Sequence, residues 1–229
     1  MRGLKFMLNS LKRLPKVLVA IIILLTLASA VLPFVLHEPL GEEDYMFPKV
    51  FIFFGGVMVV CLFSVATSSE FTMNKLVRSM PIAKEMYTRS VPLFILMCMG
   101  AQTVIMLAYF LCLGIIGAEA TQYSDTLILG SIVCGSVLAF MPFAFTVPMG
   151  GLLGLYATFI PIVVTLFMLK KEVKLYGFNA PLSIAIGIFA ATLILGAVWT
   201  FWISGVRFKR SKIKVYSNAV PIGNCTLHS

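Results

Sequence analysis

Long apolar runs alternate with short polar segments along almost the whole chain, and this pattern predicts a bundle of membrane-spanning helices. A helix needs about 20 mostly apolar residues to cross a hydrocarbon core about 30 Å thick. Six runs are close to that length or longer, and they cover residues 17–36, 50–66, 91–117, 127–147, 150–169 and 180–204. We therefore expect an all-α polytopic membrane protein whose transmembrane domain, residues 17–204, contains six helices.

Composition supports the same class. Hydrophobic residues make up 60% of the chain and charged residues 12%, and the mean hydropathy is +1.01. Soluble globular domains contain about 45–50% apolar and about 25% charged residues. An ordinary soluble domain is therefore excluded.

Basic residues fall mainly on one side of the predicted spans, which sets the expected orientation. With a cytoplasmic amino terminus, fourteen of the eighteen Lys and Arg residues lie in the inner segments 1–16, 67–90 and 205–229. An excess of Lys and Arg marks cytoplasmic segments. We expect a multi-pass cell-membrane protein with both termini in the cytoplasm and a basic cytoplasmic tail, residues 205–229. The net charge of +9 then reflects topology and contact with anionic membrane lipids rather than with nucleic acid.

Residues 1–16 predict an amphipathic helix that lies along the inner membrane surface. The apolar stripe, spaced i, i+3, i+4 and i+7, consists of Leu4, Met7, Leu8 and Leu11, and the helix is expected to end ahead of Pro15. A secretory signal with a cleavage site at residues 28–30 is the alternative interpretation. The apolar run continues to Leu36, which favours a retained span.

The longest polar interruption, residues 67–90, predicts a short amphipathic helix over residues 67–81. Its apolar stripe consists of Met73, Leu76, Val77 and Met80. Thr67 and Glu70 have the spacing of a capping box at the start of a helix, and Pro81 disfavours helix at the residue before it. A second turn over residues 82–89 leads into the third apolar run. The alternative is a solvated loop that merely joins two spans.

Pro142 in the fourth predicted span and Pro161 in the fifth are expected to kink their helices. A proline within a helix has no N–H, so the carbonyl four residues earlier loses its helical partner. In a membrane that carbonyl must find a partner within the bundle. We expect such contacts around both prolines.

The spans lack the side chains that catalysis, metal binding or ion-driven transport would need. Four of the five cysteines lie inside apolar runs and none forms a CxxC pair, so we expect small core residues and no metal site. No Asp, Glu, Lys or Arg falls within the six spans, which disfavours an ion-driven pump. No GxxxxGK[ST] phosphate loop is found. We expect no catalytic residues, and any driven transport must take its energy from another subunit.

The order of elements resembles the type-2 ATP-binding-cassette (ABC) exporter permeases, because the segment SSEFTMNKLVRSMPIAKEMYTRSV enters the third span after an interfacial helix and two spans. In that family a glutamate-led amphipathic coupling helix is followed by a Leu-Pro-type turn, a small residue and a basic residue. The matching positions are Glu70, Leu76, Ser79, Met80, Pro81, Ile82, Ala83 and Lys84. Phe71 and Thr72 stand where Gly-Thr is common in the family, and Ala83 stands where Ser or Thr is frequent.

The resemblance implies a permease subunit that pairs with a second copy or a paralogue and docks cytosolic ABC ATPase subunits. Those partners would bind the ATP, so the chain itself is expected to need no cofactor. The implied ATPase-coupling residues are Glu70, Met73, Leu76, Val77, Met80, Pro81 and Lys84.

The substrate is constrained only by the uncharged spans, which favour an amphipathic or apolar molecule such as an antimicrobial peptide or a lipid-like compound. No substrate-binding residue is assigned. Two other functions stay open: a membrane-embedded accessory or assembly protein, and the substrate-binding subunit of an energy-coupling-factor vitamin uptake system.

Overall fold

Helices account for all the regular structure in the part of the chain that a computed structural model describes. That part comprises residues 13–36, 51–60, 81–117, 120–146 and 181–217, together with Tyr156, Ile160, Val163 and Val164. Its helices are α2 (Arg13–Leu36), a short helix (Phe51–Val60), α5 (Ala83–Glu85), the π-helix η2 (Met86–Ser90), α6 (Val91–Ile115), α7 (Ala120–Thr146) and α9 (Leu182–Ser217). The all-α prediction is confirmed for these residues.

Four helical stretches are long and apolar enough to cross a membrane. They are Lys16–Leu36, Ala83–Ile115, Thr126–Phe143 and Leu182–Lys209, and they coincide with the first, third, fourth and sixth predicted spans. The second predicted span is described only over Phe51–Val60, and the fifth only at four single residues. These four helices indicate a membrane protein, whereas the count of six spans stays a prediction.

Three helices extend beyond the boundaries expected from the sequence, and one of them is α7, which begins at Ala120 instead of residue 127. α2 begins at Arg13 and runs through Pro15, which its first turn tolerates because an N–H there has no helical partner. α9 continues to Ser217, so the first part of the tail predicted over 205–229 is helical. Most of the predicted interfacial helix, residues 1–12, lies outside the described residues, as does the predicted coupling helix up to residue 80.

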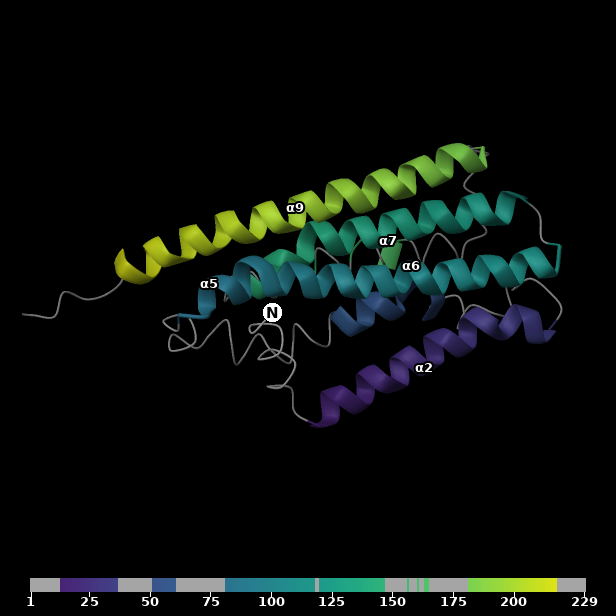
Figure 1. Ribbon diagram of the computed structural model, residues 1–229, viewed down its shortest axis with the longest axis horizontal. Coiled ribbons are helices and arrows are strands. Elements are labelled where there is room, and N and C mark those ends of the chain that lie inside the picture. The colour runs from purple at the N-terminus through teal and green to yellow at the C-terminus, as the bar shows by residue number, and fades with distance from the viewer. Residues whose placement is uncertain are drawn as a thin grey trace, which may run out of the picture.

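The helices form an elongated bundle with α6 and α7 at its centre (Figure 1). α9 lies along one edge, where it packs mainly on α7, and α2 lies along the opposite edge, where it packs on α6. Residue pairs show that α7 and α9 run parallel, because Gly135 faces Thr192 and Phe143 faces Arg207. The largest fully buried side chains include those of Phe54, Ile95, Met99, Leu138 and Met141.

Pro142 lies inside α7, and the carbonyl that it leaves without a helical partner is bonded from α9. Thr200 Oγ1 lies 2.9 Å from Leu138 O, four residues before the proline, and 2.7 Å from Gly196 O in its own helix, so the two carbonyls share its one hydroxyl proton. Beside it, Trp199 Nε1 donates to Ala139 O at 3.2 Å. The expected contact is therefore confirmed at Pro142, while Pro161 is outside the described residues.

Candidate functional site

The structure describes two of the seven predicted coupling residues. Pro81 is exposed in a turn, and Lys84 is exposed on α5. The other five lie outside the described residues: Glu70, Met73, Leu76, Val77 and Met80. The predicted amphipathic helix over 67–81 therefore stays a prediction, and the site can be built only from the segment that follows it.

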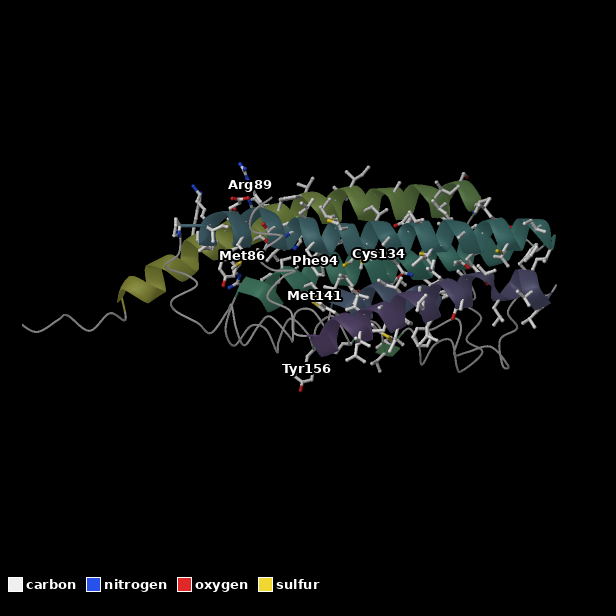
Figure 2. The ribbon with its side chains drawn as sticks, turned by 60° about the horizontal axis from the view of Figure 1, so that its bottom comes forward. Met86, Arg89, Phe94, Cys134, Met141 and Tyr156 are labelled. Carbon is white, nitrogen blue, oxygen red and sulfur yellow. The ribbon has the colours of Figure 1, made fainter. Side chains whose placement is uncertain are left out.

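That following segment, Ala83–Ser90, is helical and runs without a break into α6. Its buried residues are Ala83, Met86, Tyr87 and Ser90, which have the spacing of one helical face. Lys84 and Arg89 are exposed, and Figure 2 shows Arg89 pointing away from the bundle. The sequence carries this stripe, although only a second turn is expected here from the sequence. An amphipathic helix is thus joined directly to a membrane-length one.

A π-turn connects the two parts of this helix. The N–H of Val91 donates to Met86 O, five residues earlier instead of four. The next residue is Pro92, whose ring would clash with the carbonyl four residues before it in a regular α-helix. The wider π-turn relieves that clash, and such turns are frequent at functional sites. Pro92 therefore provides a physical reason for the irregular turn where the helix enters the bundle.

Aromatic contacts fix this end of the bundle. The rings of Tyr87 and Phe208 are stacked, with centroids 5.7 Å apart and an interplanar angle of 23°. The guanidinium of Arg207 lies 4.7 Å from the centroid of the Phe143 ring, a cation–π contact. We call these four residues the aromatic junction. Through it the segment Ala83–Ser90 is held against α9, and α9 against α7.

A second polar site lies inside the bundle, where Gln102 of α6 bonds to the backbone of the short helix Phe51–Val60. Gly56 N–H donates to Gln102 Oε1 at 2.8 Å, and Gln102 Nε2 donates to Ile52 O. In an α-helix the N–H of residue 56 would pair with the carbonyl of residue 52. The carboxamide of Gln102 therefore bonds to both the N–H of Gly56 and the carbonyl of Ile52, two groups that pair with each other in a regular α-helix. Gln102 is 1% exposed, so this contact is shielded from solvent.

Glycines make the close approach of three helices possible at this point. A Cβ on Gly56 would lie 3.0 Å from Gln102 Oε1 and 3.2 Å from Cys98 O. A Cβ on the adjacent Gly55 would overlap the side chain of Thr26 on α2. The pair Gly55 and Gly56 thus lets the short helix fit between α2 and α6. We call Thr26, Gly55, Gly56 and Gln102 the amide site.

The amide site is not among the features expected from the sequence, although the sequence holds a signal for it. Gln102 is the only Asn or Gln within the six predicted spans. An amide in hydrocarbon requires hydrogen-bond partners. Its partners lie 46 and 50 residues away along the chain, so their identity could come only from the fold.

These arrangements are suited to transmitting movement between helices. Within the described part of the chain, no group of three or more His, Cys, Asp or Glu residues could hold a metal ion. The aromatic junction and the amide site both join helices that are far apart in sequence. They therefore determine which helices can move together.

No protein-family model, no curated protein and no solved structure matches the chain.

Proposed function

We propose that the chain is the transmembrane permease subunit of an ATP-driven ABC exporter. In this proposal it moves an amphipathic or apolar substrate, such as an antimicrobial peptide or a lipid-like molecule, out of the cell. Separate cytosolic ATPase subunits bind and hydrolyse the ATP, and a second copy or a paralogue completes the export path. The sequence resemblance over residues 67–90 is the starting point of this proposal.

The observation that carries the proposal is the amphipathic helical segment Ala83–Ser90, continuous with α6 and stacked on α9 through Tyr87 and Phe208. A force applied to residues 67–81 by a closing pair of ATPases would act directly on this segment. Packed cores and interfaces transmit displacement as rigid-body movement. Both α6 and α9 would then move with the ATPases.

The amide site supports the same mechanism. The predicted coupling helix connects the short helix Phe51–Val60 to α6, and Gln102 ties these two helices together inside the bundle. Gln102 lies 19 residues beyond Ala83, or about 28 Å along a helix. The short helix and α6, joined through the predicted coupling helix and again at Gln102, would respond to the ATPases as a pair.

Co-purification tests the proposal. Leu76→Glu places a charge on the apolar stripe that would dock into a groove of the ATPase. We expect the wild-type chain, isolated from its native membrane in mild detergent, to carry a stoichiometric ATPase subunit that Leu76→Glu loses. Asn74→Glu is the matched control, since it adds the same charge on the opposite face of the predicted helix and should retain the partner.

The alternatives give different results in this experiment. A chain that purifies without any ATPase would contradict the exporter proposal and favour the accessory or assembly protein. A tightly bound vitamin-like molecule would favour the energy-coupling-factor subunit. If both glutamate variants retain the ATPase, the coupling role of residues 67–81 is wrong.

A further inference from the structure

A groove of about 590 Å³ lies between α7 and α9, and its lining includes no residue of the aromatic junction or of the amide site. Small residues line it from both helices, namely Gly135 and Ala139 on α7 and Gly196 on α9. Trp199 and Trp202 form part of its wall, and Trp202 is 57% exposed, so the groove opens toward the surroundings of the bundle. Its volume is within the range of small-molecule sites.

The groove results from the close contact between two parallel helices. A Cβ on Gly196 would lie 2.9 Å from Leu138 Cβ, so the two helices can pack at this distance only because residue 196 is glycine. The indole N–H of Trp199 is bonded to Ala139 O, which fixes this ring against α7. The groove is therefore held in shape by packing and by a hydrogen bond.

The length and position of the groove match one leaflet of a bilayer. On α9 the lining extends from Thr192 to Trp202, ten residues or about 15 Å along a helix. That is half of a hydrocarbon core about 30 Å thick. Tryptophans lie at one end of the groove, and in membrane proteins tryptophan is enriched at the boundary with the headgroups. The groove thus runs along the acyl chains and ends near the headgroup level.

Positive charge lies just beyond that tryptophan end. Arg207 is five residues past Trp202, or about 7.5 Å along α9, and the exposed Lys209 follows it. The guanidinium of Arg207 lies over Phe143, one helical turn past Ala139 on α7. Both helices therefore place this cation at the same mouth of the groove. A guanidinium over a ring keeps its N–H donors for a phosphate.

We propose that this groove is a binding site for an anionic phospholipid. One acyl chain lies along the small residues of α7 and α9, beside Trp199 and Trp202, and the phosphate lies against Arg207 with Lys209 nearby. The apolar lining explains the acyl chain, and the basic mouth explains the choice of an anionic headgroup. This inference does not depend on the proposed transport function.

The chain contains only two tryptophans, and both line the groove, so its fluorescence reports directly on this site. We would reconstitute the protein in vesicles of equimolar phosphatidylglycerol and phosphatidylcholine, with brominated acyl chains on either one lipid or the other. Bromine quenches nearby tryptophan, and the overall membrane charge is the same in both samples. One cation near the surface favours an anionic lipid about fivefold. We expect brominated phosphatidylglycerol to occupy the groove about fivefold more than brominated phosphatidylcholine.

Variants separate this site from a general attraction of anionic lipid. Arg207→Gln combined with Lys209→Gln removes both cations at the mouth and should bring the occupancy ratio close to one, while Arg207→Lys, which keeps the charge, should retain most of it. Arg89→Gln removes the same charge at the same end of the bundle but away from the groove, and should leave the ratio unchanged. Equal quenching by both lipids in the wild type would overturn the proposal. Absence of quenching by either lipid would also overturn it, because the groove would then be closed to lipid.

Discussion

Gln102 shows how a single polar residue can determine the packing of a membrane-embedded helix. Its carboxamide has a donor and an acceptor, and both are paired with the backbone of the short helix Phe51–Val60. Only one orientation of the amide satisfies both contacts, because the oxygen must face Gly56 N–H and the nitrogen must face Ile52 O. A shift of either helix by one residue would separate these groups. Gln102 therefore specifies the register of α6 against its neighbour.

Gly56→Ala tests this close approach. The added methyl would lie 3.0 Å from Gln102 Oε1 and 3.2 Å from the backbone oxygen of Cys98, which cannot move like a side-chain tip. Overpacking of this kind lowers the free energy of unfolding by about 1–3 kcal/mol. We expect a corresponding fall in the melting temperature of the purified protein in detergent, followed by circular dichroism.

Gly100→Ala is the matched control on the partner helix. Nothing lies within 4 Å of a Cβ at this position, so the methyl meets no neighbour. Because alanine favours helix over glycine by about 0.5–1 kcal/mol, this variant should be neutral or slightly more stable. Equal melting temperatures for the two variants would show that the packing at the amide site is looser than described here.

At the scale of helices, prolines determine two features of the bundle. Pro92 requires the wider turn of η2, which joins the amphipathic segment to α6. Pro142 frees Leu138 O, and Thr200 of α9 supplies the missing hydrogen bond. In hydrocarbon an unpaired carbonyl is costly, so the proline and the threonine act together although 58 residues separate them. The proline in α7 thereby favours packing against α9.

Thr200→Val measures the strength of that link. Valine has almost the same shape, but it removes, at a fully buried position, the hydroxyl that Leu138 O shares with Gly196 O. Hydrogen bonds between membrane helices contribute about 0.6 kcal/mol on average and up to about 1.7 kcal/mol. Because this carbonyl has no partner within its own helix, we expect a loss of stability of about 1–2 kcal/mol in denaturant unfolding of the purified protein.

Thr103→Val is the corresponding control. The hydroxyl of Thr103 donates only to Met99 O, four residues earlier in the same helix, and that carbonyl still has the backbone N–H of residue 103 as a partner. This variant should leave the unfolding midpoint almost unchanged. A Thr200→Val variant as stable as Thr103→Val would mean that α7 does not depend on α9 for its freed carbonyl.

For the whole molecule, the sequence predicts the helical architecture well where local properties decide it. The first span is predicted over 17–36 and is found at Lys16–Leu36, and the fourth is predicted over 127–147 and is found at Thr126–Phe143. The length of an apolar run is a local property, so it identifies a membrane-length helix without knowledge of the fold. The need of Leu138 O for a partner outside its own helix is also a local property, because it follows from the position of Pro142 alone.

Contacts between distant segments could not be predicted in this way. Nothing near Tyr87 indicates that it stacks on Phe208, and nothing near Gln102 indicates Gly56 as its partner. These pairs depend on how the helices pack, which one sequence does not specify residue by residue. Of the predicted coupling residues, only Pro81 and Lys84 are described, so the assignment of that site still rests on the amphipathic pattern and the resemblance.

The number of spans is the remaining whole-molecule prediction, and reporter fusions test it. Green fluorescent protein fluoresces only on the cytoplasmic side of a bacterial inner membrane, and alkaline phosphatase is active only on the outer side. With six spans, fusions after residues 82, 148 and 229 should be fluorescent, and fusions after residues 48, 118 and 178 should have phosphatase activity. The distribution of Lys and Arg favours this alternation.

Two pairs of fusions test whether the second and fifth predicted spans cross the membrane. These are the two spans that the structure describes least. Fusions after 48 and 82 flank the second predicted span, and fusions after 148 and 178 flank the fifth. Each pair should report opposite sides, because an apolar run of about 20 residues crosses the membrane once. If the 148 and 178 fusions report the same side, residues 150–169 do not cross, and α9 must then enter from the side on which α7 ends. That result would reverse the orientation of α9 relative to α7, contradicting the parallel packing shown by the pairs Gly135–Thr192 and Phe143–Arg207.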